Sequence, residues 1–208
     1  MKHKITPCVL TSSRICIRPH MNGDEFLLNQ AILDSFDKLH EWMEWAIKPP
    51  SIEETKVYIE FSQKCWSIED PEELPLLIFD ANEENLIGSA GFNAINWKVP
   101  AFEVGYWANN QHSGDGLITE AVNMLTQHAF SIWDAKRIEI RCDPKNTKSA
   151  AIPKRLGFLL EAHFKNHRVQ PISNNLSGTL VFVRYESDGL PKIEYRLKNF
   201  LPDKSADK

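Results

Sequence analysis

Residues 102–130 read FEVGYWANNQHSGDGLITEAVNMLTQHAF, and this stretch decides the fold. An apolar segment with strand character, residues 102–108, leads into a loop that contains two glycines. A helix then begins near Leu117, because apolar residues recur from that point at helical spacing. The recurring positions are Leu117, Ala121, Leu125 and Ala129. A strand, a glycine-containing loop and a helix therefore follow one another directly.

The loop between this strand and this helix, residues 111–116, reads QHSGDG. Glycines allow the backbone to approach a ligand closely, and the unpaired N–H groups of a first helical turn attract anions. A strand-to-helix turn also often needs a glycine for its geometry alone. The loop by itself therefore leaves two interpretations open, a phosphate-binding site and a simple turn.

The composition is that of a globular protein with one domain. The chain has 208 residues, 42% hydrophobic and 25% charged, which is enough for one core and short for two. It contains no apolar run of membrane-spanning length and no signal-peptide pattern, so we expect a cytoplasmic protein. The net charge of −4 argues against direct binding to nucleic acid.

The cysteine and histidine residues show no metal-binding spacing. The four cysteines are scattered without a Cys-x-x-Cys pair, which is typical of reduced thiols in a cytosolic chain. The seven histidines include no His-Glu-x-x-His pattern. We therefore predict no metal site.

Hydrophobic periodicity and turn signals predict the remaining elements. Strands are expected at 13–18, 74–79, 85–97, 137–142, 158–162 (a continuation to 169 is left open) and 179–185. Helices are expected at 24–45, from a capping box at Ser51 and Glu54 to residue 66, and at 146–156. Gly88 predicts a bulge or a close backbone approach. We expect an exposed, mobile loop at 171–178, a last element within 193–201 and a frayed tail at 202–208.

Read in this order, the chain resembles the GNAT superfamily of acyl-CoA-dependent N-acetyltransferases. Within it, the chain is most similar to the RimJ/RimL-like branch, which acetylates the N-termini of ribosomal proteins. The resemblance runs from Leu10 to Val183, which implies a single domain over 1–208 with a core at about 10–185 and an extension at 186–208. The matching motifs are 11–19 (TSSRICIRP), 42–46 (WMEWA), 49–51 (PPS), 87–91 (IGSAG), 103–107 (EVGYW), 111–116 (QHSGDG), 143–149 (DPKNTKS) and 156–158 (LGF).

The resemblance implies an α/β fold whose mixed, mostly antiparallel sheet splays between its two central strands and is flanked by helices. It also implies acetyl-CoA as cosubstrate, lying in the split. The pantetheine arm would pair with the backbone of Val104, Gly105, Tyr106 and Trp107. The pyrophosphate would bind the loop residues Gln111, His112, Ser113, Gly114, Asp115, Gly116 and Leu117. A dinucleotide-binding fold would need a third glycine at Thr119, and the sequence lacks it.

The resemblance also assigns catalytic roles. Glu103 matches a carboxylate that acts as general base, and its alternative is an ion pair with Arg137 or Arg141. Ser149 matches a serine that donates a proton to the departing thiolate, and its alternative is local hydrogen bonding at a helix end. Asn146 matches a cofactor-facing amide, which also suits an N-cap. Backbone N–H groups near Val104 or Gly105 would polarise the thioester carbonyl.

The acceptor side is less specific. Trp42, Met43 and Trp45 match the wall of an acceptor pocket, although aromatic residues at helical spacing are more often core. The branch implies a protein N-terminal amine as acceptor. A small amine, such as a polyamine or aminoglycoside, and a non-catalytic acyl-CoA-binding module are the alternatives. We expect a monomer or a homodimer.

Four positions depart from the family pattern. Asp115 places a like charge beside the expected pyrophosphate. Pro153 stands where many members have a Tyr that acts as general acid, and proline is expected to kink or break its helix. Phe182 and Gly178 replace a Tyr and an Asp that are common in this branch.

Overall fold

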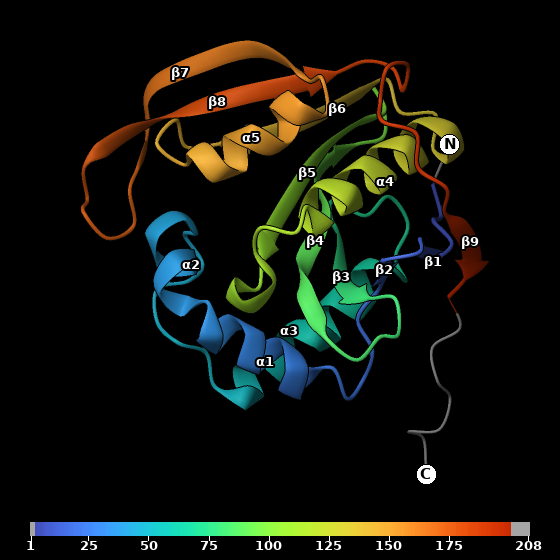
Figure 1. Cartoon of the computed structure of the whole chain (residues 1–208), viewed down its shortest axis with the longest axis horizontal. Coiled ribbons are helices and arrows are strands. Elements are labelled where there is room, and N and C mark those ends of the chain that lie inside the picture. Colours follow the sequence, from blue (N-terminus) through green and yellow to red (C-terminus); the bar gives the residue numbers. More distant parts are fainter. Residues whose placement is uncertain (1–2, 201–208) are drawn as a thin grey trace.

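The computed structural model describes residues 3–200 of the chain. Within them, one sheet of nine strands runs in the order β7-β8-β6-β5-β4-β3-β2-β1-β9 and is flanked by five α-helices (Figure 1). The neighbouring strands are antiparallel except β5 and β6, which are parallel. The predicted α/β fold with a mixed, mostly antiparallel sheet is confirmed.

The strands are β1 (Cys8–Thr11), β2 (Ile15–Arg18), β3 (Leu74–Asp80), β4 (Leu86–Asn96), β5 (Ala101–Ala108), β6 (Arg137–Cys142), β7 (Leu159–Val169), β8 (Leu176–Arg184) and β9 (Arg196–Asn199). The helices are α1 (Glu25–Asp34), α2 (Phe36–Trp42), α3 (Ile52–Cys65), α4 (Leu117–Ile132) and α5 (Thr147–Arg155), with a 3₁₀ turn η1 (Asn110–His112). Within residues 3–200, no helix has both the length and the apolar character that a membrane span requires.

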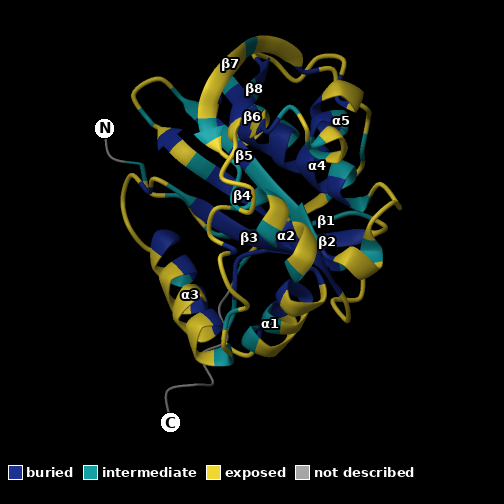
Figure 2. Ribbon diagram, turned by 90° about the vertical axis from the view of Figure 1, so that its left-hand side faces the viewer, coloured by how far each residue is buried: buried dark blue, intermediate teal, exposed yellow. Residues whose placement is uncertain are grey.

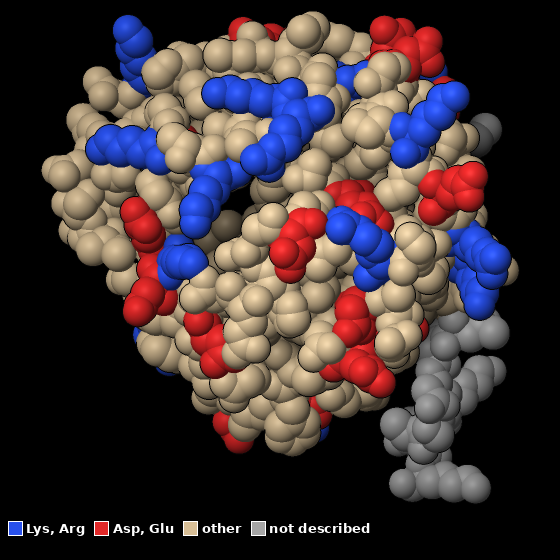
Figure 3. Space-filling view, viewed as in Figure 1, with Lys and Arg blue, Asp and Glu red and all other residues tan. Residues whose placement is uncertain are grey.

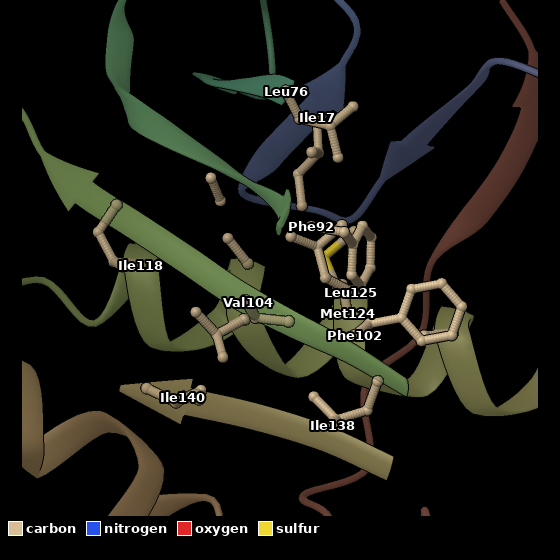
Figure 4. Packing of buried hydrophobic residues seen from close by; sticks show 14 of the residues in the cluster. Ile17, Leu76, Phe92, Phe102, Val104, Ile118, Met124, Leu125, Ile138 and Ile140 are labelled. Carbon is tan, nitrogen blue, oxygen red and sulfur yellow. The ribbon is translucent and has the colours of Figure 1, made fainter. Parts of the chain in front are cut away.

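The sheet opens between its two central strands. The pairing of β5 with β6 covers only three positions and ends at Glu103 opposite Glu139, although β5 continues to Ala108. Figure 4 shows the two ribbons separating from the Phe102 and Ile138 end towards the Ile140 end. The backbone of β5 beyond Glu103 is thus hydrogen-bonded to β4 on one side and faces the opening on the other. The predicted splay is confirmed.

Side-chain alternation along β5 separates two cores. Phe102 and Val104 pack with α4 on one face, whereas Trp107 packs on the other face against a cluster that includes Leu28 of α1 and Leu39 of α2. Figure 2 shows β3 and β4 mostly buried and β5 largely intermediate in exposure. β5 is therefore a central strand of the sheet that is nevertheless partly accessible to solvent.

The expected helix over 24–45 is wrong as a single element. It divides at Ser35, where α1 ends and α2 begins, and α2 stops at Trp42. The Ser35 hydroxyl accepts a hydrogen bond from the backbone N–H of Asn110 at 2.8 Å. The helix is interrupted at the residue whose side chain binds this distant loop. Apolar periodicity alone does not predict such an interruption.

Smaller features of the structure agree with the sequence predictions in part. The capping box of Ser51 and Glu54 is confirmed. Gly88 makes the expected close approach, because a Cβ there would lie 2.2 Å from the Trp107 carbonyl oxygen. Strand β1 was not predicted, and β9 lies within the expected 193–201. The loop at 171–178 is too long by three residues, because β8 begins at Leu176. The tail at 202–208 lies outside the described residues.

Candidate active site

A groove of about 1740 Å³ crosses the molecule where the sheet opens. It is lined by the end of β5, the loop after it, the first turn of α4, the end of α2, the start of α5 and residues 191–196. Figure 3 shows the surface hollowed in the region between α2 and α5, with Lys and Arg side chains beside the opening. This groove brings together residues from five stretches of the chain, which lie within 11–14, 38–43, 106–123, 145–156 and 191–196.

The loop before α4 has the geometry of an anion site. Gly114 and Gly116 have φ values of +119° and +78°, conformations that L-residues with a side chain rarely adopt. Gly116 is the N-cap of α4 and has no side chain to bond the first-turn amides. Those N–H groups therefore point at the groove beside the positive end of the helix dipole. The phosphate interpretation of the loop is supported by this shape.

Asparagine and glutamine side chains hold the loop from behind. Asn109 donates through Nδ2 to the Leu86 carbonyl at 2.9 Å and accepts from the Gln111 N–H at 3.2 Å. Gln111 donates through Nε2 to Asp34 of α1 at 2.8 Å. The Gln111 side chain thus anchors the loop to α1 and does not line the groove, whereas the other predicted loop residues, His112, Ser113, Gly114, Asp115, Gly116 and Leu117, do line it.

Arg14 lies at the groove, although its place in the motif at 11–19 predicted no role for it. Its Nε donates to Glu120 of α4 at 2.6 Å and its Nη1 donates to the carbonyl oxygen of Asp115 at 3.3 Å. Because its guanidinium lies against the loop, it offsets the negative charge that Asp115 brings there. No local signal reveals this role, since Arg14 and Asp115 are 101 residues apart in the sequence.

The start of α5 forms the facing wall of the groove. Asn146 is its N-cap and accepts a hydrogen bond from the backbone N–H of Ser149 at 3.0 Å, and both residues line the groove. Asn146 therefore performs the capping role that was its alternative, while it also faces the expected ligand. The hydroxyl of Ser149 contacts the phenol of Tyr106 at 3.3 Å.

Tyr106 and Trp107 of β5 line the groove, and Glu103, Val104 and Gly105 are absent from its described lining. Glu103 lies on the opposite face of the strand from Phe102 and Val104. Its carboxylate is 3.3 Å from Nε of Arg141, so the alternative ion pair is present. Burial raises the pKa of Glu103, Arg141 opposes that rise and Glu139 adds to it.

Two of the three predicted acceptor-side residues lie at the groove. Trp42 and Met43 line it, whereas Trp45 is outside its lining and 52% exposed. Arg168 of β7 donates to the Trp42 carbonyl at 3.1 Å and lies 3.4 Å from Glu44. This contact joins the β7–β8 hairpin to the end of α2 and closes the acceptor side.

The family departures have structural explanations in three cases. Pro153 lies inside α5, and the expected break is wrong, because the helix continues to Arg155. A Cβ at Gly178 would lie 2.7 Å from the Phe164 carbonyl oxygen, so an aspartate does not fit there. Phe182 is buried in the core of the sheet. Among the described residues, no group of three or more His, Cys, Asp or Glu side chains is arranged to hold a metal.

The model of the acetyltransferase (GNAT) domain family matches residues 14–159, which is more than half of the chain. The chain belongs to the GNAT acetyltransferase family. A ribosomal-protein-serine acetyltransferase of Escherichia coli is 35% identical over 40% of this chain and 46% of its own length. YdaF of Bacillus subtilis, named as a candidate ribosomal N-acetyltransferase, is 28% identical over 72% of this chain and 80% of its own.

Solved structures share the fold over nearly the whole chain. RimL, a ribosomal L7/L12 α-N-protein acetyltransferase in complex with coenzyme A, superposes with a TM-score of 0.78 at 23% identity, over 85% of this chain and 97% of that one. Mycobacterium smegmatis RimJ in complex with CoA-disulfide gives 0.76 at 20% identity, over 91% and 93%. The sequence match to the Escherichia coli enzyme, by contrast, spans about half of that enzyme's length.

Proposed function

We propose that this protein is an N-acetyltransferase that moves an acetyl group from acetyl-CoA to a primary amine, with a protein N-terminal α-amine as the acceptor. The observation that carries the proposal is the opening of the sheet between β5 and β6 directly beside the anion loop of α4. The extended pantetheine arm of acetyl-CoA needs an open strand edge, and its pyrophosphate needs an anion site directly beyond that edge. Relatives named for ribosomal-protein acetylation support the acceptor class.

The groove residues fit coenzyme A. The loop offers backbone N–H groups for a pyrophosphate, and a Cβ at Gly114 would meet no atom of the described residues within 4 Å. Basic residues at the groove, Arg14, Lys145, Lys148 and Arg155, suit further phosphate oxygens. The free edge of β5 suits the amides of a pantetheine arm. Acetyl-CoA would supply the activated thioester, and the remaining chemistry belongs to the chain.

The catalytic groups lie on the two sides of the open strand. Glu103 would accept the proton of the acceptor ammonium through water, and burial that raises its pKa brings it closer to neutral pH. Ser149, at the groove, would donate its hydroxyl proton to the sulfur when the carbon–sulfur bond breaks, and would regain a proton through water from the nitrogen that becomes the amide. A backbone N–H of β5 near Val104 would polarise the carbonyl. In this assignment Arg141 holds Glu103 ionised and in place.

The acceptor end is bounded by Trp42, Met43 and Glu41, with Lys38 nearby. This mixed lining favours a peptide amine over a polycation, because other acidic side chains expected to attract a polycation lie elsewhere. Glu44 pairs with Arg168, and residues 69–73 are outside the lining. A cytoplasmic location and a monomeric or homodimeric state stay predictions.

The test is intact-mass analysis of ribosomal proteins and of short peptides incubated with the protein and acetyl-CoA. We expect one added acetyl group on peptides with a free N-terminus, and none on the same peptides with a blocked N-terminus and a free lysine. Glu103→Gln should reduce the rate by about a hundredfold, the usual contribution of a general base. Glu53→Gln, an exposed change on α3, should leave it unchanged.

Two other outcomes would replace this proposal. Turnover on polyamines or aminoglycosides but on no peptide would assign a small-molecule acceptor. Tight binding of acetyl-CoA with no turnover on any amine would assign a non-catalytic acyl-CoA-binding module.

A further inference from the structure

Pro153 removes one hydrogen bond from the inside of α5. In an α-helix the N–H of a residue donates to the carbonyl four residues before it, and proline has no N–H. The carbonyl four residues before Pro153 belongs to Ser149. The helix continues through this point to Arg155. The Ser149 carbonyl therefore needs a donor from outside the helix if it is to be satisfied.

Tyr106 of β5 supplies that donor. Its phenol donates to the carbonyl oxygen of Ser149 at 3.0 Å, and the Ser149 hydroxyl donates back to the phenol oxygen at 3.3 Å. The residue lies at the groove and its ring packs against the core on the α4 side. One side chain thus contacts both the backbone and the hydroxyl of Ser149 across the opening of the sheet.

We propose that Tyr106 is a positioning residue for Ser149, in which a phenol from β5 replaces the backbone donor that Pro153 cannot provide. This inference rests on the proposed function for its catalytic meaning, because it assumes that the Ser149 hydroxyl acts at the groove. Its structural part, the replacement of one donor by another, stands on the hydrogen bonds alone.

The surroundings of Ser149 make this contact effective. Its backbone N–H donates to the side chain of Asn146, which is the N-cap of α5. Burial raises the pKa of Tyr106, so the phenol stays protonated and remains a donor at neutral pH. Ser149 is therefore fixed through its N–H, its carbonyl and its hydroxyl. Loss of Tyr106 would free two of these three groups.

Hydrogen exchange tests the structural part without any acceptor. In Tyr106→Phe, we expect the amides of α5 to exchange roughly fivefold faster, the equilibrium factor of about one net hydrogen bond. Adding Pro153→Ala restores a backbone donor to the Ser149 carbonyl, and exchange in the double variant should return to within about twofold of the wild type. Tyr58→Phe on α3, outside the groove lining, is the matched control and should leave α5 unchanged.

Kinetics test the catalytic part. We expect Tyr106→Phe to lower kcat by about tenfold while the KM for acetyl-CoA stays within about twofold. In a Ser149→Ala background the same change should lower kcat no further, because Tyr106 acts through Ser149. If the double variant instead loses kcat by the product of the two single-variant losses, Tyr106 makes its own contact with the reacting atoms, and the positioning role is wrong.

The two parts fail separately. If the wild type acetylates no acceptor, the proposed function fails, and hydrogen exchange still decides whether Tyr106 replaces the donor lost at Pro153. If Tyr106→Phe leaves the exchange of α5 unchanged, or if Pro153→Ala does not reverse its effect, the inference is wrong even in an active enzyme.

Discussion

Two helix N-termini face the same groove, and their caps are opposite in kind. The N-cap of α4 is Gly116, which has no side chain and leaves the first-turn N–H groups available to a ligand. The N-cap of α5 is Asn146, whose side chain accepts from the N–H of Ser149 and so satisfies part of its own helix. An uncapped N-terminus binds an anion from outside. A capped one instead fixes the position of its own residues.

Because of this difference, we expect the α4 N-terminus to bind the cofactor and the α5 N-terminus to position a catalytic side chain. The α4 end provides backbone donors and is held in shape by glycine conformations and by Asn109. The α5 end provides a side chain, Ser149, held by Asn146 and Tyr106. Disruption of the first should therefore weaken binding, whereas disruption of the second should slow turnover. Three substitutions test this division.

The largest effect is expected for Gly114→Ala. An alanine at a φ of +119° is strained by about 1–3 kcal/mol, and relief of the strain would change the shape of the loop. We expect the Kd for acetyl-CoA to rise at least about tenfold in calorimetric titration.

Gly23→Ala is the matched control, because Gly23 also has a positive φ of +98° and open space around it, outside the groove lining. It should lose similar stability and keep the wild-type Kd. Equal affinity in the two variants would show that the loop does not hold the cofactor.

Asn146→Ala should have an intermediate effect, and on turnover more than on binding. Loss of an N-cap lowers the free energy of unfolding by about 1 kcal/mol, and here it also frees the N–H of Ser149. Ser51→Ala removes the cap of α3, where Ser51 accepts from Glu54 outside the groove lining, and should cost about the same stability. Thermal unfolding should match in the two variants, and only Asn146→Ala should lower kcat. A fall in kcat for both would contradict the division.

The α4 side was predictable from sequence because its signals are local. The strand, QHSGDG and the helix are contiguous, and glycine directly reports the backbone conformation that the loop adopts. Two contacts were not predictable, because each joins residues far apart in the chain. On the α5 side, Tyr106 and Ser149 are separated by 43 residues, and at the α4 loop Arg14 and Asp115 are separated by 101. The break at Ser35 was missed for the same reason, since its partner Asn110 lies 75 residues away.

Pro153 illustrates the limit in one residue. From sequence it predicts a broken helix, because proline removes a donor. The donor is indeed removed, but a phenol from another strand occupies its place, and the helix continues to Arg155. The loss of the backbone hydrogen bond is predictable from the proline itself. The replacement donor, Tyr106, is visible only in the tertiary structure.

The smallest effect is expected for Asp115→Asn, which removes a like charge from beside the pyrophosphate site. Arg14 contacts the backbone carbonyl of Asp115 and not its carboxylate, so the substitution leaves that hydrogen bond in place. We expect the Kd for acetyl-CoA to fall by about twofold to threefold at low salt and the difference to shrink as salt screens the charges. Asp134→Asn, an exposed change outside the groove lining, should leave the Kd unchanged at every salt concentration. Weaker binding by Asp115→Asn would contradict this expectation. It would mean that the Asp115 carboxylate stabilises the conformation of the loop by more than it repels the pyrophosphate.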